Sequence, residues 1–495
     1  MSASSPQRMP WGYRWRSSGL FVLIATVTSV LTDMFLHQFL VSILPSILED
    51  RVNLDSALLQ RVSVALLAQT ALISFLVTPI IGRLANYLHA RTWLLLGLIG
   101  QLGGSVLIAS THSVITLFGG RAIQALANAI VGILGAKSLS HVSSSDGHER
   151  IQRILTLAVA AGSSGGPLVA GTLFEVSNYW TAWKSAFAAS LIGIILQSMM
   201  LLPTQEVSVE THVAEVQSHT DTESNPDENS PLLPASFKTI RTQLPADVKS
   251  AKRDLNLYFR LLTSRRYMGG ILSSVCFAIV SGSFDTTLPL HVSEAFQWGS
   301  QPTGMLFAVL HGPHVFLSAP VHWLKRRVGS HHTASVGFFG LAILLWLAGT
   351  PGNERFPWTS PGGRGPVIYA SAIATAGVFM SLLQGAGLME TARKAVLACA
   401  VQELAHEQPD TFDAEATLHA MVISSLSLKL GLFLGPIISG RLVDTWGYYD
   451  MNCVLGQLPP IELVIERPVR ERRALADESS SGHVLGLCDC LRLEL

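Results

Sequence analysis

The chain has 495 residues, of which 49% are apolar and 14% charged, and its mean hydropathy is +0.40. So few charges cannot cover the surface of a soluble protein of this length, and the composition therefore favours an all-α integral membrane protein. The formal net charge of zero excludes a basic chain built to bind nucleic acid. The five cysteines are scattered without metal-site or disulfide spacing, and we expect no metal and no cofactor.

Eleven apolar runs are long enough to cross a bilayer, whose hydrocarbon core requires about 20 helical residues. They lie at 20–44, 62–82, 93–110, 113–136, 154–173, 182–202, 268–290, 305–323, 333–349, 367–388 and 418–443. The predicted organisation is a tail (1–19), a six-helix half (20–202), a central loop (203–266), a second half with five recognisable helices (267–455) and a polar tail (456–495).

Lysine and arginine placement predicts the orientation, because basic residues gather on the cytoplasmic side of membrane proteins. Arg8, Arg14 and Arg16 precede the first run, and later basic turns fall on the same side. We therefore expect a cytoplasmic N-terminus and a cytoplasmic central loop. That loop is acidic and serine-rich, then basic, so it cannot bury enough apolar surface to fold alone and should be largely disordered.

A glycine-proline pattern occurs once in each half. Its members are Gly162, Gly166, Pro167 and Gly171 in the first half, and Gly431, Gly435, Pro436 and Gly440 in the second. Proline is tolerated in a membrane helix, and glycines four residues apart let another helix approach closely. The pattern predicts two six-helix halves related by a parallel repeat, a design that places substrate between the halves near mid-membrane.

Ionisable residues inside apolar runs are functional candidates, because burying a charge in a membrane is costly. Asp33 lies near the middle of its run, whereas Asp285 could instead mark the outer end of one. Arg121 is either a coupling residue or a structural pin bonded to carbonyl groups. Lys429 either pairs with a carboxylate or extends toward the membrane surface.

From these residues we expect proton coupling at Asp33 and Asp285, and a substrate cavity at Gln124, Lys429 and Gln384. The interleaved apolar and aromatic side chains suit a hydrophobic or weakly cationic substrate. His311 and His314 share one helix face, but two ligands are too few for a metal site, so we expect them to serve packing or hydrogen bonding.

These motifs resemble the major facilitator superfamily, in particular its proton-coupled drug-efflux branch and the related vesicular amine transporters. The segment from Gly162 to Gly171 is similar to the fifth-span antiporter signature of exporters. Arg121 with Gln124 resembles the fourth-span arginine motif, in which Ala125 replaces the usual glycine. The resemblance, which spans about residues 20–449, implies that Arg121 takes part in proton coupling.

A loop after the second run resembles the gating loop of that family. The residues concerned are Gly82, Arg83, Leu84, Asn86 and Arg91, with Arg327 and Gly329 in a second copy. Asn86 stands where an aspartate is usual, and Arg326 occupies the acidic position of the second copy. The resemblance therefore implies that closure of the gate rests on other contacts.

The family pattern would continue into a twelfth helix after Leu455, but this chain continues with Pro459, Pro460 and a charged run. Two interpretations stay open: a misread gene end that replaced the last helix, or a real form with eleven spans.

Together these features predict a secondary active transporter, a proton-coupled exporter of small amphipathic organic compounds that works by alternating access. A vesicular or vacuolar amine loader is an alternative, favoured by a dileucine sorting pattern at Glu228, Leu232 and Leu233. A transport-inactive receptor or interaction protein is an alternative of another class. No phosphate loop or nucleophile elbow suggests an enzyme. We expect a monomer in the plasma membrane, or in a vacuolar or vesicular membrane, with a small molecule, protons and lipid as partners.

Overall fold

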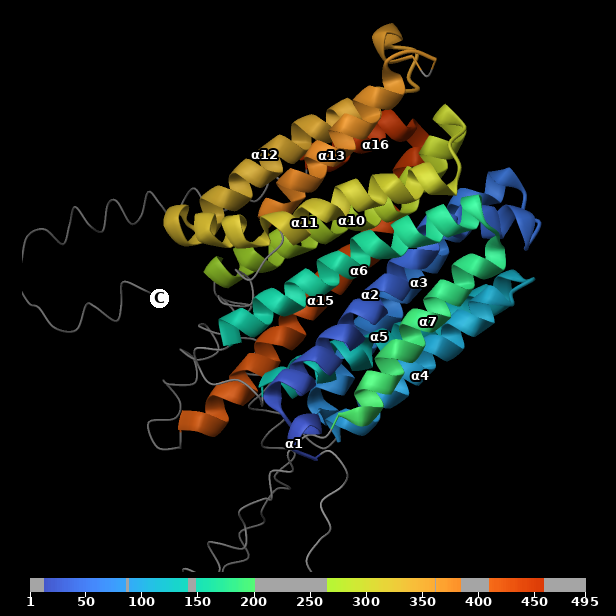
Figure 1. The fold of residues 1–495 in the computed structure, drawn as a ribbon. Coiled ribbons are helices and arrows are strands. Elements are labelled where there is room, and N and C mark those ends of the chain that lie inside the picture. The colour runs from blue at the N-terminus through green and yellow to red at the C-terminus, as the bar shows by residue number, and fades with distance from the viewer. Residues whose placement is uncertain are drawn as a thin grey trace, which may run out of the picture.

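The computed structural model describes residues 13–85, 89–140, 148–200, 265–360, 362–383 and 409–457. Within these ranges the secondary structure is helical, and eleven helices are long and apolar enough to cross a membrane (Figure 1). Both the all-α fold class and the eleven predicted spans are thereby confirmed. The central loop 203–266 lies outside the described residues except for its last two positions.

The first half begins with a short turn of helix and continues with six long helices. Their bounds are α1 Tyr13–Arg16, α2 Gly19–Asp50, α3 Ser56–Leu84, α4 Ala90–Ala109, α5 Val114–Ser140, α6 His148–Val176 and α7 Tyr179–Met199. The Ser18 hydroxyl accepts a hydrogen bond from the Phe21 amide at 3.3 Å and caps the start of α2. Helix α2 continues past the predicted end at Leu44, because Pro45 lies inside it without ending it.

The second half has five long helices followed by a shorter one. They are α10 Arg265–Phe296, α11 Ser300–Val328, α12 Ser330–Gly349, α13 Gly365–Leu383, α15 Pro409–Trp446 and α16 Tyr448–Gln457. A 3₁₀ turn, η2 Pro357–Thr359, lies between α12 and α13. Because α10 extends to Phe296, Asp285 lies well inside it and is buried. The alternative that Asp285 is a helix-boundary residue is therefore wrong.

Helix α16 follows the eleventh span directly, in the region where the family pattern would continue into a twelfth helix. Its ten residues pack against α12, with Met451 and Leu455 buried and the Trp346 indole donating to the Tyr449 hydroxyl at 3.0 Å. The chain after Gln457 lies outside the described residues. Residues of α16 therefore belong to the packed core of the second half, as part of the cluster that includes Tyr369.

The duplicated glycine-proline motif sets the same packing in each half, the fifth helix against the first. An added Cβ at Gly162 of α6 would lie 2.7 Å from the Leu31 carbonyl oxygen of α2. At Gly431 of α15, the equivalent position, the distance to the Val275 carbonyl oxygen of α10 would be 2.5 Å. Only glycine permits approaches this close.

In each half a serine hydroxyl on the first helix also donates a hydrogen bond to a carbonyl oxygen of the motif on the fifth helix. Ser42 of α2 donates to the Pro167 carbonyl oxygen at 3.2 Å, and Ser283 of α10 donates to the Gly435 carbonyl oxygen at 3.3 Å. The proline and glycine that receive these bonds occupy neighbouring positions of the two motifs. The sequence repeat is thus a repeat of structure as well.

The last glycine of each motif contacts the opposite half. Gly171 of α6 packs on the backbone of Ser300 in α11, and Gly440 of α15 packs on the Val64 side chain in α3. Figure 1 shows α6 and α11 running side by side along this junction. We refer to these junctions as the α6–α11 seam and the α3–α15 seam. The two halves therefore meet along two equivalent seams.

One end of the bundle carries the connections from α2 to α3 and from α10 to α11, and we call it the distal end (Figure 1). The opposite end, where α2 begins, is the proximal end. Several polar contacts between the halves lie at the distal end. Gln301 donates its backbone amide to the Glu175 carboxylate at 2.7 Å, and the Ser46 and Ser300 hydroxyls are 3.2 Å apart.

Candidate functional site

A buried carboxylate on α2 is held by two side-chain amides. Asp33 accepts a hydrogen bond from Gln101 Nε2 of α4 at 2.9 Å and from Asn128 Nδ2 of α5 at 2.6 Å. Each carboxylate oxygen therefore has an N–H donor. Donors on both oxygens stabilise the charged form of a carboxyl group inside the bundle.

The same asparagine joins this carboxylate to a cation of the other half. The Lys429 ammonium group of α15 donates to Asn128 Oδ1 at 2.7 Å, and its charge acts on Asp33. Lys429 is half-buried near the middle of α15. A carboxylate, an amide and an ammonium group thus form a chain across the interface, so Lys429 reaches Asp33 through Asn128.

The second buried carboxylate, Asp285 of α10, also contacts the opposite half. Gln38 Nε2 of α2 lies 3.3 Å from one carboxylate oxygen and 3.4 Å from the other. The charge of Arg121, on α5, acts on Asp285. Each carboxylate therefore accepts from an amide, and each is within the electrostatic influence of a cation from the other half.

Arg121 is the most deeply buried charge of the group, with 0% of its surface exposed. Its guanidinium donates to Gln124 Oε1 at 3.1 Å and to the His37 carbonyl oxygen of α2 at 3.4 Å. Gln124 in turn donates to the Ser105 hydroxyl of α4 at 2.9 Å. Arg121 thus makes the carbonyl contact of a structural pin and also acts on a carboxylate.

Two acceptor atoms next to the carboxylates have no hydrogen-bond partner among the described residues. They are Oε1 of Gln38 and Oε1 of Gln101, both buried, and each belongs to the glutamine whose Nε2 holds a carboxylate. Buried polar atoms are normally paired. Each carboxylate thus has a vacant acceptor on the side chain that already donates to it.

Sequence reasoning missed three members of this site, namely Gln38, Gln101 and Asn128. One signal was available for Asn128, because Arg121, Gln124 and Asn128 are spaced three and four apart and share one face of α5. Gln101 is a polar side chain in a long apolar helix, and that alone marks a candidate.

The gating-loop residues lie at the proximal end. Gly82 faces the Val422 side chain of α15, while Arg83 and Leu84 are exposed. Asn86 lies outside the described residues. The Arg91 guanidinium donates to the Ser198 carbonyl oxygen at 2.7 Å, a contact inside the first half between α4 and the end of α7.

The second copy of the loop ends α11. The Arg327 guanidinium lies 4.8 Å from the centre of the Trp323 ring on the same helix, and Gly329 follows with a φ of +95°. The described contacts of Arg91 and Arg327 are therefore made within each half.

The two histidines that share one face of α11 lie among aromatic side chains. Gln384 lies outside the described residues. The His311 and His314 rings are 6.1 Å apart in α11, beside Phe307 and Phe277. In the part of the chain that the structure describes, no group of three His, Cys, Asp or Glu side chains could hold a metal ion.

Comparison with known families agrees with this architecture. The family model described as Major Facilitator Superfamily matches residues 21–396. The chain belongs to the Major Facilitator Superfamily. It is accordingly a multi-pass membrane transporter, and the resemblance seen in its motifs is confirmed.

Two members of the superfamily illustrate how far relatives can differ from this chain in sequence. It is 23% identical over 474 residues to the MFS-type transporter ppzB of Metarhizium rileyi, covering 92% of this chain and 96% of that protein. It is 25% identical over 332 residues to the tetracycline resistance protein, class H, of Pasteurella multocida, covering 66% of this chain and 73% of that protein.

A solved structure shares the fold. The human organic anion transporter MFSD10 (TETRAN) superposes with a TM-score of 0.54 at 14% identity, over 90% of this chain and 99% of that one. At this identity the likeness concerns the fold alone.

Proposed function

We propose that this superfamily member is a proton-coupled exporter of small amphipathic organic molecules that works by alternating access. One observation carries the proposal: each buried carboxyl group is hydrogen-bonded to the opposite half. Asp33 reaches Lys429 through a shared amide, and Asp285 accepts directly from Gln38. Protonation of either carboxyl group would change the attraction between the halves, which is what coupling a proton to their relative movement requires.

The seams supply the second requirement, two halves that can move against each other as rigid units. One core cluster gathers around Trp183 and another around Tyr369, and each lies mostly within one half. At the distal end the described contacts between the halves include three polar pairs and the close packing of Gly171 and Gly440. A state opened at that end would have to break these contacts.

The substrate class is inferred from the polar cluster and from a relative. Asp33, Asp285, Arg121 and Lys429 carry two charges of each sign, so the site has no strong overall preference for one sign. A tetracycline resistance protein among the relatives supports an amphipathic organic substrate. Lysine and arginine placement supports an orientation with the distal end facing outward. The likeness of the segment from Gly162 to Gly171 to the signature of exporters supports export, and we propose the plasma membrane as its location.

The test is transport by the full chain reconstituted in lipid vesicles, with tetracycline and ethidium as probes and an imposed pH gradient as the driving force. We expect gradient-dependent probe movement that is lost in Asp33→Asn and in Arg121→Ala. Asp450→Asn is the matched control, because Asp450 is a partly exposed carboxylate that pairs with Arg355 inside the second half.

Equal probe movement with and without the gradient would refute proton coupling. Probe binding without movement, in vesicles that hold folded protein, would favour the transport-inactive receptor instead.

A further inference from the structure

We propose that Asn128 is a positioning residue that transmits protonation of Asp33 to Lys429, and so to the contact between the halves. The inference rests on the proposed proton coupling and adds residues to it. Its basis is the geometry of one amide group, whose Nδ2 donates to the carboxylate at 2.6 Å and whose Oδ1 accepts from the ammonium group at 2.7 Å.

An amide in this position strengthens both of its hydrogen bonds. The carboxylate pulls on the N–H side, and the ammonium group pulls on the C=O side, so the two charges polarise the amide in the same direction. Loss of the charge at Asp33 weakens the bond on the opposite side of the amide. Because Asp33 and Asn128 lie in the first half and Lys429 in the second, that weakened bond is one that joins the halves.

The cluster also has a place for the added proton. When Asp33 binds a proton, one oxygen becomes an O–H group and must donate, but both present neighbours donate N–H. Gln101 Oε1 is buried and has no partner among the described residues. Rotation of the Gln101 amide presents this oxygen to the O–H group, so the protonated state keeps its hydrogen bonds without the help of Asn128.

Among the charged and titratable groups around Asp33, Lys429 is the one that responds when Asp33 loses its charge. Helix α5 adds Arg121, which acts on Asp285 and on His37. Asp285 of α10 is held by Gln38. Helix α4 offers the neutral Gln101, while α6 and α7 approach α2 at this level through Gly162 and Gly193. His37, on α2 itself, is also near both cations.

The experiment measures the distance between the halves as a function of pH, without substrate. Spin labels are placed at His112→Cys, in the connection from α4 to α5, and at Glu354→Cys, in the connection from α12 to α13. Both positions are exposed at the distal end. The full chain is used in lipid vesicles, with its five native cysteines replaced by alanine.

We expect the distance distribution of the parent to change as the pH falls, and Asn128→Leu to lose the same part of this response that Asp33→Asn loses. Combining the two changes should remove no more than either alone. Asn128→Gln, which keeps an amide, should restore at least part of the response. Lys429→Gln breaks the chain from the other side and provides a second test if Asn128→Leu does not fold.

A full pH response in folded Asn128→Leu would overturn the inference, as would losses in Asn128→Leu and Asp33→Asn that add. The parallel transport assay separates this result from the proposed function. Proton-driven tetracycline movement with an Asn128-independent pH response would overturn the relay alone. An Asn128-dependent pH response without any proton-driven movement would overturn the exporter proposal alone.

Discussion

At the scale of single residues, neighbours on one helix have different environments because the helical period turns them to different faces. Trp183 of α7 is 1% exposed and packs between Phe39 of α2 and Phe187, with ring centres 5.2 and 6.0 Å away. Trp180, one turn earlier, is 49% exposed. The two tryptophans therefore form a matched pair for measuring what burial contributes.

We predict that Trp183→Ala lowers the free energy of unfolding by about 3–5 kcal/mol, because it leaves a cavity between α2 and α7. Trp180→Ala should cost roughly 1 kcal/mol or less, since that ring is half exposed and its described ring contacts are Tyr179 and the Arg51 guanidinium, 5.8 Å from its centre. Thermal unfolding of both variants in detergent is the measurement. Similar losses in the two variants would contradict the packing described here.

The charged members of the candidate site could be predicted at this scale, but the amides could not. A charge inside an apolar helix is conspicuous because its burial is costly, which singled out Asp33, Arg121, Asp285 and Lys429. Glutamine and asparagine are less costly and occur in helices for many reasons. Their importance depends on which helix faces them, and that is a property of the tertiary structure.

At the scale of helices, the glycine-proline motif determines how closely the fifth helix of each half approaches the first. The motif contains an internal comparison. Gly162 leaves no room for a Cβ, whereas a Cβ at Gly165 would meet only the Phe35 ring, at 3.9 Å. The two positions lie on the same helix and differ in the space beside them.

We predict that Gly162→Ala lowers the free energy of unfolding by roughly 1–3 kcal/mol, the usual cost of overpacking a tight contact. Gly165→Ala should be neutral or stabilising by up to about 1 kcal/mol, because alanine is the better helix former. The two variants would be compared by their melting temperatures, measured by size-exclusion chromatography after heating. An equal loss at both positions would mean that α6 is sensitive to any added methyl group.

Helix positions and the tight packing of the motif could be predicted from hydropathy and glycine spacing, but several helix ends could not. Helices α2 and α10 both extend past the predicted ends at Leu44 and Leu290. Each contains a proline near that point, Pro45 in α2 and Pro289 in α10, and a mixture of apolar and polar residues follows. Composition alone does not show where a helix leaves the membrane and continues into water.

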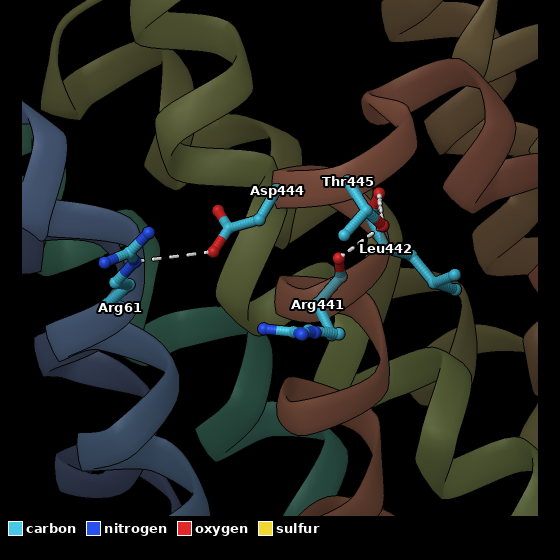
Figure 2. Close-up of polar contacts among 5 residues, drawn as sticks. All are labelled: Arg61, Arg441, Leu442, Asp444 and Thr445. Atoms are coloured by element: carbon cyan, nitrogen blue, oxygen red, sulfur yellow. Dashed lines mark hydrogen bonds and ion pairs between the residues drawn. The ribbon is translucent and has the colours of Figure 1, made fainter.

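At the scale of the whole molecule, one of the contacts that join the two halves at the distal end is an exposed ion pair. Arg61 Nε of α3 lies 3.6 Å from Asp444 Oδ2 of α15, with the side chains 71% and 33% exposed (Figure 2). Figure 2 also shows Thr445 turned back to its own helix, where its hydroxyl donates to the Arg441 carbonyl oxygen at 2.8 Å. Asp444 is the member of this turn that reaches across the α3–α15 seam.

We predict that Asp444→Asn shifts the equilibrium toward states opened at the distal end by about 0.2–1 kcal/mol, the usual value of an exposed ion pair. That is a change of up to about fivefold in the ratio of the two spin-label distance populations. The effect should shrink at high salt. Asp450→Asn removes a pair within the second half and should leave the ratio unchanged, so a shift there would contradict the assignment.

The arrangement between the halves is the part that sequence reasoning captured least. The internal repeat predicted that two similar halves exist and that polar groups would meet between them. It did not predict which carboxylate would meet which cation. Asp33 is joined through Asn128 to Lys429 of the other half, and that pairing depends on how whole helices lie against one another.

The two seams have a consequence for how such a molecule could arise. The fifth helix of each half packs on the second helix of the other, so every half carries both the glycine surface and the surface that receives it. This is the reciprocal contact of an isologous homodimer, in which one patch binds its own copy. The chain is thus organised as a dimer whose subunits are joined end to end. A first half produced alone would retain a self-complementary surface.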